Sequence, residues 1–162
     1  MTTQRTLNFR ELESALFFVG TITWDILEKA KLYYGTIPVA DKFEERHGVE
    51  TDGEGTINIY VGEDLPGLLH ELGHAAHVLK YPECLEWPAW KAEAYAMLSD
   101  MRAMKAKKYL TPEERKAFAY HVRESRKQGF PEHLKGLKVA FRAVFGHSRR
   151  KDQEKYIVET QD

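Results

Sequence analysis

The 162-residue sequence predicts a single α+β domain, and three observations favour this fold class. Apart from one short β-prone run near the C-terminal end, strand-like runs lie in the first part of the chain, up to about Gly62, whereas helical periodicity dominates the rest. No repeat or low-complexity linker divides residues 1–162. Apolar residues make up 43% of the chain, enough to build one core. We therefore expect a backing helix, a small mixed sheet of two to four strands, and then a series of helices.

The N-terminal part combines one helical segment with short strands. Residues 10–34 carry apolar side chains mainly at helical spacing, with an interruption around Gly20–Thr23. Between Gly35 and Gly62, glycines and Pro38 punctuate the runs TIPVA and TINIYV, which have the composition of strands. Two or three strands are expected there, the last at Thr56–Val61.

Two helices are expected next, separated by a loop. Asp64 is a suitable N-cap and Pro66 falls in the first turn of a helix that runs to about Leu79. Tyr81–Trp87 contains a proline, precedes another, and is expected to form the loop. A long helix is then predicted over Pro88–Lys108.

Two more helices and a tail complete the chain. Thr111-Pro112-Glu113-Glu114 is a capping box that opens a helix to about Lys127. The helix after Pro131 has one apolar stripe, formed by Leu134, Leu137, Phe141, Val144 and Phe145. Residues 147–162 end with the β-prone run Tyr156–Val158, which predicts a terminal strand.

The small net charge of −1 hides three blocks of opposite sign. Residues 1–100 carry 8 Lys/Arg against 17 Asp/Glu, residues 101–151 carry 15 against 4, and residues 152–162 carry 1 against 4. A basic block of this kind is either the solvated face of helices or a surface for nucleic acid or an acidic partner.

Cysteine usage and hydropathy favour a cytoplasmic protein. Cys84 is the single cysteine and excludes an internal disulfide, and the first residues lack the layout of a signal peptide. The longest apolar run, ALFFVGTITW, is about half of what a bilayer-spanning helix needs. No membrane association is expected.

The run Leu68–His77 carries the chemistry. His70 and His74 are four residues apart, so on a helix both imidazoles can reach a single tetrahedral zinc. Glu71 then lies beside the metal without binding it, where it can take the proton of the water that zinc activates. The opposite face of this helix is apolar, and Gly73 permits the close approach of a neighbouring element.

A catalytic zinc needs a third protein ligand. Glu93 is the best candidate, because it falls on an otherwise apolar helical face where an unpaired carboxylate is costly. Asp100, seven residues later, is either an outer partner of a ligand histidine or part of a simple salt bridge. His77 is too far along the helix from His70 for all three histidines to share one ion. The loop offers less favoured candidates: Glu83, Cys84 and Glu86.

His70-Glu71-Leu72-Gly73-His74, followed by Glu93 in KAEAYAMLSD, resembles the gluzincin clan of zinc peptidases. The short chain most resembles the single-domain minigluzincins, with the antirepressor-type ImmA/IrrE peptidases next. The resemblance implies a zincin-like fold, with Glu71 as general base and His70, His74 and Glu93 as ligands of one Zn2+.

The resemblance also implies that an extended substrate lies along Thr56–Val61, where Asn58 and Tyr60 would meet it. Two departures from zinc-peptidase patterns stand out. Thermolysin-like gluzincins have an aspartate where this chain has Met97, and metzincins need a glycine at His77 and a histidine at Lys80, which excludes that branch.

A peptidase also needs a donor for the oxyanion of the transition state. Tyr95, Tyr120 and His121 are available by their chemistry, and no spacing selects among them.

The sequence therefore predicts a zinc-dependent endopeptidase that acts on an extended peptide or protein, with no prediction of oligomeric state. Its C-terminal segment, 147–162, is a candidate inhibitory or strand-adding tail that would make the enzyme latent. The alternative is a zinc-stabilised regulatory module whose basic half binds nucleic acid or an acidic partner.

Overall fold

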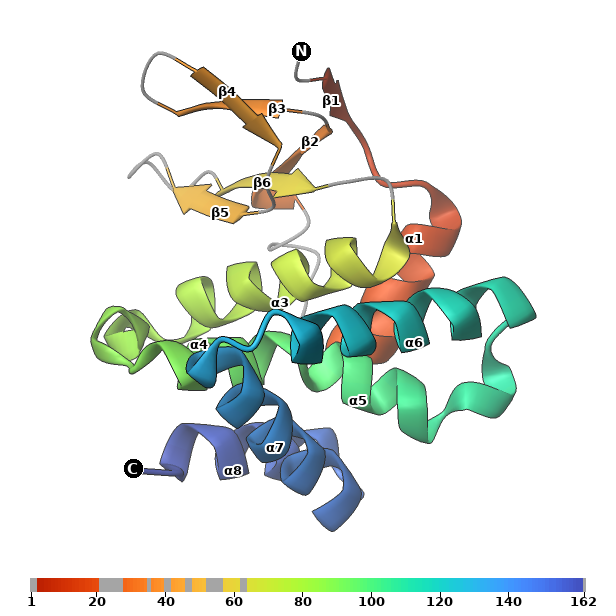
Figure 1. Ribbon diagram of the computed structural model, residues 1–162, viewed down its shortest axis with the longest axis vertical. Helices are drawn as coiled ribbons and strands as arrows, with labels where there is room; N and C mark the ends of the chain where they lie inside the picture. The colour runs from red at the N-terminus through yellow and green to blue at the C-terminus, as the bar shows by residue number, and fades with distance from the viewer. Residues whose placement is uncertain are drawn as a thin grey trace.

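The computed structural model describes residues 3–20, 28–34, 36–39, 42–45, 48–51, 57–61 and 64–161. Strands gather at one end of the molecule and helices form the rest, with α3 directly beneath the sheet and α7 and α8 at the opposite end (Figure 1). One cluster of buried apolar side chains extends from Ala15 to Ile157 and joins sheet and helices. The α+β class is confirmed.

The main sheet is mixed and has the strand order β1-β2-β6-β5. Strand β2 (Ala30–Tyr34) runs parallel to β6 (Ile57–Val61), whereas β1 (Thr3–Arg5) and β5 (Gly48–Thr51) are antiparallel to their neighbours. A separate antiparallel pair consists of β3 (Thr36–Val39) and β4 (Lys42–Glu45).

The sheet order corrects the predicted substrate edge. Strand β6 is paired on both sides, with β2 and β5, so Asn58 and Tyr60 do not lie on a free edge. The strand that ends the sheet on this side is β5. The run INIYV is apolar at alternate positions because Ile57 and Ile59 are fully buried against the helices, as befits an interior strand. Thr56 lies outside the described residues.

The predicted N-terminal helix is only partly correct. A helix α1 (Phe9–Ser14) with an Asn8 capping box continues as a π-helix, η1 (Ala15–Val19), and ends at Gly20 with φ +79°. Residues 30–34, predicted as helix, form β2. Apolar residues four apart satisfy a strand as well as a helix, and here exposed Lys31 next to buried Leu32 follows the strand period. The predicted interruption falls largely on residues 21–27, outside the described ranges.

The histidine-bearing helix is confirmed. It is α3 (Leu65–Lys80), and Asp64 caps it by accepting a hydrogen bond from the Gly67 N–H at 2.7 Å. Of the predicted apolar face, Leu69, Leu72 and Ala76 are fully buried and Leu79 is partly buried. The connection that follows contains a 3-10 helix, η2 (Pro82–Glu86).

The predicted long helix is two helices. These are α4 (Ala89–Ala96) and α5 (Leu98–Lys105), which meet at Met97, and a 3-10 turn η3 (Lys107–Tyr109) follows. The next helix, α6 (Pro112–Lys127), begins with the predicted capping box between Thr111 and Glu114.

The helix α7 (Pro131–Gly146) buries a different face from the one predicted. Leu137 and Val144 are buried, but Phe141 and Phe145 are 48% and 44% exposed and stack on each other. The buried face consists mainly of small residues: Gly136, Val139, Ala140 and Ala143. Small residues are needed because α7 packs closely on α4, so that a Cβ at Gly136 would lie 3.1 Å from the Ala94 nitrogen.

The predicted terminal strand is wrong, since residues 150–159 form the helix α8. Ile157 is fully buried, and Lys91 of α4 donates to the Val158 carbonyl at 3.0 Å near the end of α8. Burial of Ile157 therefore decides the conformation of a β-prone run. The helix packs on α7 and α4, so it adds no strand to the sheet.

Among the described helices, none is both long and apolar enough to cross a membrane.

Candidate metal centre

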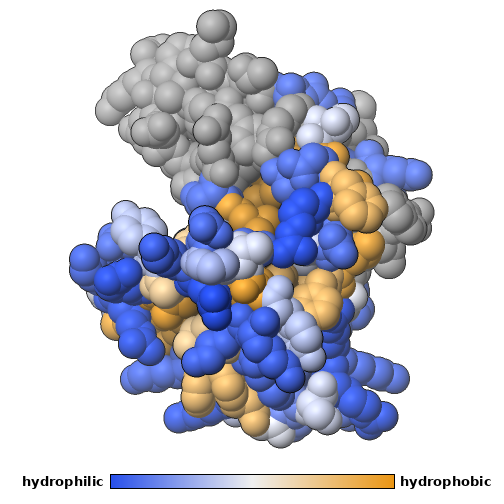
Figure 2. Space-filling view, turned by 90° about the vertical axis from the view of Figure 1, so that its right-hand side faces the viewer, coloured by the Kyte–Doolittle hydropathy of each residue, from blue (hydrophilic) through white to orange (hydrophobic). Residues whose placement is uncertain are grey.

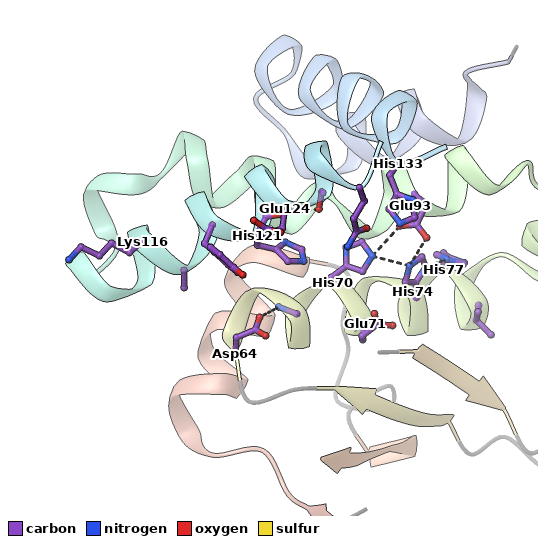
Figure 3. Close-up of a pocket in the computed structure, with 16 residues that line it drawn as sticks. Asp64, His70, Glu71, His74, His77, Glu93, Lys116, His121, Glu124 and His133 are labelled. Carbon is purple, nitrogen blue, oxygen red and sulfur yellow. Dashed lines mark hydrogen bonds and ion pairs between the residues drawn. The ribbon is translucent and has the colours of Figure 1, made fainter. Parts of the chain in front are cut away.

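A cleft of about 1060 Å3 opens beside α3, and α6 forms its other wall. Most of the ionisable side chains that line it are histidines and carboxylates, labelled in Figure 3. The cleft brings together the residues that the sequence singled out on α3 with Glu93 of α4 and His121 of α6.

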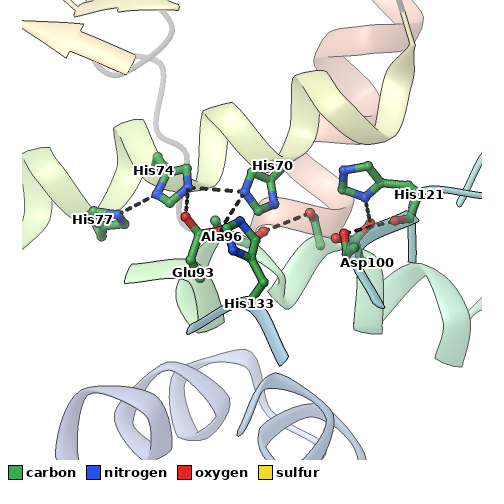
Figure 4. A network of polar contacts seen from close by, with 10 residues as sticks. His70, His74, His77, Glu93, Ala96, Asp100, His121 and His133 are labelled. Atoms are coloured by element: carbon green, nitrogen blue, oxygen red, sulfur yellow. Dashed lines mark hydrogen bonds and ion pairs between the residues drawn. The ribbon is translucent and has the colours of Figure 1, made fainter. Parts of the chain in front are cut away.

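His70, His74 and Glu93 converge on one point between α3 and α4 (Figure 4). The two Nε2 atoms lie 3.2 Å apart, Glu93 Oε2 lies 3.1 Å from His70 Nε2, and Glu93 Oε1 lies 3.4 Å from His74 Nε2. Two ligands of a tetrahedral ion with bonds of about 2.0–2.1 Å are separated by about 3.3–3.4 Å. The spacing of these three donors fits zinc.

Gly73 explains how Glu93 reaches the two histidines. A Cβ at Gly73 would lie 2.8 Å from the Ala96 Cα, so the α3 and α4 backbones touch at this point. Ala96 is three residues after Glu93, on the same side of α4. The close approach expected from Gly73 is thus confirmed, and it places the carboxylate one turn from the contact.

His77 is in hydrogen-bond contact with His74. Its Nε2 lies 2.9 Å from His74 Nδ1, and His77 is 5% exposed. Burial lowers the pKa of His77 to about 3, so the ring is neutral and can accept at Nε2 the proton on His74 Nδ1. Nε2 of His74 is then an unprotonated donor atom that faces Glu93. His77 supports a ligand and is not itself within the ligand group.

The arrangement at Glu93 could hold a cation. Burial opposes ionisation of Glu93, but the contacts with His70 and His74 hold its pKa well below the usual range. Its Oε2 is buried without a hydrogen-bond partner, although it faces His70 Nε2. Lone pairs that face one another at such distances in a buried site are stabilised by a shared proton or a metal ion.

His133 is a cleft residue that the sequence analysis missed. It lies in the first turn of α7, with Nε2 3.5 Å from Glu93 Oε2. No local pattern marks it, since it follows Glu93 by 40 residues. The only indirect signal is Gly136, one turn later, whose Cβ would lie 3.1 Å from Glu93 Cβ and which therefore lets α7 approach α4.

Glu71 lines the cleft from the side of α3 that faces the sheet (Figure 3). The side chain is 6% exposed, and burial raises its pKa to about 7. A carboxyl group with a pKa near neutrality can both accept and return a proton, which is the property that a general base needs.

Asp100 is paired with His121 and not with a ligand histidine. Its Oδ1 accepts a hydrogen bond from His121 Nδ1 at 2.9 Å, and Asp100 is 1% exposed. Burial opposes the charged ring of His121, yet the Asp100 carboxylate raises its pKa above the usual value. Asp100 thus has a salt-bridge partner in His121, whose Nε2 can face the cleft, and it also lies in a group with His70 and His121 whose ligand atoms are within 4.8 Å of one another.

The other two candidate donors to the oxyanion, Tyr120 and Tyr95, differ in their position relative to the cleft. Tyr120 lines the cleft and is 60% exposed. Tyr95 is 2% exposed and donates its hydroxyl proton to Glu154 of α8, away from the cleft lining. Tyr95 is therefore excluded as a donor to a substrate in this cleft.

The loop candidates do not reach the site. Glu83, Cys84 and Glu86 lie in η2, and none of them lines the cleft. Among the described residues, none after His133 lines it either, so segment 147–162 does not form part of the cleft lining, and its inhibitory role stays a prediction.

No protein-family model, no curated protein and no solved structure matches this chain.

Proposed function

We propose that the protein is a zinc-dependent endopeptidase that cleaves peptide bonds of extended protein segments in this cleft. The observation that carries the proposal is the convergence of His70, His74 and Glu93 to within 3.1–3.4 Å of one another, beside a buried Glu71. The gluzincin resemblance of the sequence points to the same chemistry.

Each cleft residue has a distinct part in the proposed reaction. His70, His74 and Glu93 would hold the zinc ion, which would supply an activated water, because the pKa of a zinc-bound water falls to roughly 7. The Glu71 carboxylate takes a proton from the attacking water and returns it to the amide nitrogen as the C–N bond breaks. His121, oriented through Nδ1 by Asp100, donates from Nε2 to the oxyanion that develops on the carbonyl.

The substrate is expected to bind along β5. Strand β5 pairs with β6 and ends the sheet on this side, and it also contacts α3. An extended peptide that pairs with this edge would run above α3, with the α6 wall of the cleft on its other side. This replaces β6 as the proposed substrate strand.

The decisive experiment compares Glu71→Gln with the wild type. The variant should bind one zinc per chain and fold normally, while cleavage of denatured casein falls by at least about 100-fold because the general base is gone. Glu86→Gln, an exposed residue outside the cleft, is the matched control and should keep full activity. Full activity in Glu71→Gln, or wild-type cleavage that persists in a strong chelator, would contradict the proposal.

A further inference from the structure

A second concave site lies on the opposite side of α6 from the cleft that contains the candidate metal centre, which we call the metal cleft. This groove, of about 560 Å3, lies between α6 and the segment that ends α5 and begins η3. Basic side chains surround it: Lys107, Arg115, Arg123 and Arg126. They belong to the basic block of residues 101–151, whose Lys and Arg side chains are not ligands of the candidate metal centre.

The floor of the groove is apolar. Phe118 and Val122, 2% and 8% exposed, form it together with Met104, whose side chain is 38% exposed. Figure 2 looks onto the side of the molecule where α5 joins α6, and hydrophobic surface shows there between hydrophilic residues. A groove of this size can accommodate apolar side chains of a ligand. A ligand that covers the groove would remove the Met104 side chain from water.

The positive charge of the groove has no counterpart in its lining. The lining contains no Asp or Glu, and none of the four basic side chains forms an ion pair with another residue that the structure describes. Of the three acidic residues of α6, Glu114 binds Arg10, Glu124 contacts Lys127 and lines the cleft of the candidate metal centre, and Glu113 lies outside the lining of the groove. The groove therefore favours an anionic ligand.

We propose that this groove binds an acidic segment of a partner protein that inserts apolar side chains between the four basic residues. Nucleic acid fits the groove less well. Phe118, the aromatic residue of the lining, is buried in the floor and offers no face on which a base could stack. An acidic segment with leucine or phenylalanine residues matches both the charged rim and the apolar floor.

The groove and the metal cleft lie on two faces of the same helix, α6. One face of α6 carries Tyr120 and His121 into the metal cleft, and the other carries Phe118 and Val122 into the groove. A partner segment seated in the groove therefore rests on the helix that positions His121. The groove assignment itself does not depend on zinc or on peptidase activity.

The test is a binding measurement with a short fluorescent peptide rich in Glu, Leu and Phe, performed on the full-length Glu71→Gln protein so that the probe is not cleaved. Two matched peptides accompany it, one with Lys in place of Glu and one with Ser in place of Leu and Phe. The first peptide should bind with an affinity that falls as salt rises, and both matched peptides should bind at least about tenfold more weakly.

Variants locate the site. The pair Arg123→Glu and Arg126→Glu should weaken binding by at least about tenfold, and Ala119→Phe, which fills the groove without a change of charge, should do the same. Arg142→Glu, an exposed charge reversal on α7 outside the groove, should leave binding unchanged. Unchanged zinc content and helix content establish that each variant is folded.

Several results would overturn the proposal. Equal binding of the Ser-substituted peptide would show that the apolar floor is not used, and unchanged binding by Ala119→Phe would place the peptide elsewhere. A preference for single-stranded DNA or for anionic lipid vesicles over the acidic peptide, lost in the Arg123/Arg126 double variant, would assign the groove to those ligands instead.

Discussion

Two clusters of buried polar side chains each contain one residue of α4, and these two residues point in nearly opposite directions from the helix. Glu93 points to His70 and His74, whereas Tyr95, two residues later and about 200° around the helix, points to Glu154 of α8. We refer to His70, His74 and Glu93 as the metal cluster, and to Tyr95, Arg102, Gln153 and Glu154 as the α8 cluster.

The α8 cluster joins most of its donors to acceptors, and Arg102 Nη2 is its one described side-chain atom that is buried without a hydrogen-bond partner. Tyr95 donates to Glu154, and Arg102 donates from Nε to Gln153 Oε1 at 2.8 Å and from Nη1 to the Phe18 and Val19 carbonyls at 2.8 and 2.7 Å. Together with Arg150, which donates to the Leu16 and Phe17 carbonyls, Arg102 satisfies the end of η1. A buried network paired in this way stabilises the fold.

The metal cluster has a different character. Its ligand atoms, the two imidazole Nε2 atoms and the Glu93 carboxylate, lie close together, and the tautomers of His70 and His74 decide which ring nitrogens donate and which accept. Burial and short distances are common to both clusters and therefore do not distinguish structure from function. The kinds of side chain do differ, since only the metal cluster gathers imidazoles and a carboxylate that could hold an ion, and this difference makes the two clusters separable by experiment.

The largest effect is expected from removal of α8. Truncation after Gly146 deletes the partners of Tyr95 and Arg102 and exposes the site of Ile157, so the protein should unfold or become much less stable, with no gain of activity. If the truncated chain is insoluble, Ile157→Ala measures the same contact and should lower the free energy of unfolding by about 2–5 kcal/mol in denaturant titrations. A truncated protein that folds and is more active would support the hypothesis that the C-terminal segment inhibits the enzyme.

Single substitutions should separate the two clusters. Glu93→Gln should weaken zinc binding by more than about 100-fold, because a charged ligand is lost, while the metal-free protein keeps or gains stability. Glu154→Ala should lower the free energy of unfolding by about 1–3 kcal/mol and leave zinc affinity unchanged. Zinc titration and chemical denaturation of both variants check this, and similar profiles for the two would refute the distinction.

A smaller effect is expected at His77, which lies outside the ligand group but orients His74. His77→Ala should weaken zinc binding by about 10–100-fold, since the tautomer of His74 is no longer fixed. His77→Gln, whose side-chain oxygen can accept the same proton, should recover part of the affinity. An unchanged zinc affinity in His77→Ala would show that the contact is only packing.

The smallest effect concerns a polar contact at the surface. Arg10 binds Glu114 at 2.6 Å and joins α1 to α6. Burial opposes ionisation of Glu114, but the Thr111 cap and Arg10 lower its pKa below the usual value of 4.5. A lowered pKa in the folded state stabilises the protein above pH 4.5, and the contribution disappears as the pH falls through the folded-state value.

Arg10→Ala should therefore lower the free energy of unfolding by less than about 1 kcal/mol at neutral pH. The difference from the wild type should shrink in acid, as measured by denaturation at a series of pH values. A difference that grows in acid would contradict the assigned role of Arg10.

Features that depend on residues close together in the chain could be predicted from the sequence. The Asp64 cap, the spacing of His70 and His74, and the Thr111 capping box depend on contacts within one or two turns, and the structure confirms these elements. Glu93 was predictable as a ligand candidate because a lone carboxylate on an apolar face is costly wherever the helix packs.

Features that depend on distant partners could not be predicted. Residues 150–159 are helical because α4 and α7 bury Ile157, and β-propensity carries no information about that burial. His133 reaches Glu93 only because Gly136 brings α7 onto α4, and β5 ends the sheet through pairing with β6. Each of these outcomes is decided by packing between elements far apart in the chain.

The contact of Gly73 with Ala96 also sets the size of ion that the metal cluster accepts. Because backbone touches backbone there, no flexible side chain can adjust the distance from α3 to Glu93. Donors 3.1–3.4 Å apart suit short bonds. Calcium, with bonds of about 2.3–2.6 Å, requires donors more than about 3.7 Å apart in the same geometry and would have to push α4 away from Gly73. If the metal cluster holds an ion as proposed, the close helix crossing would thus favour ions that form short bonds.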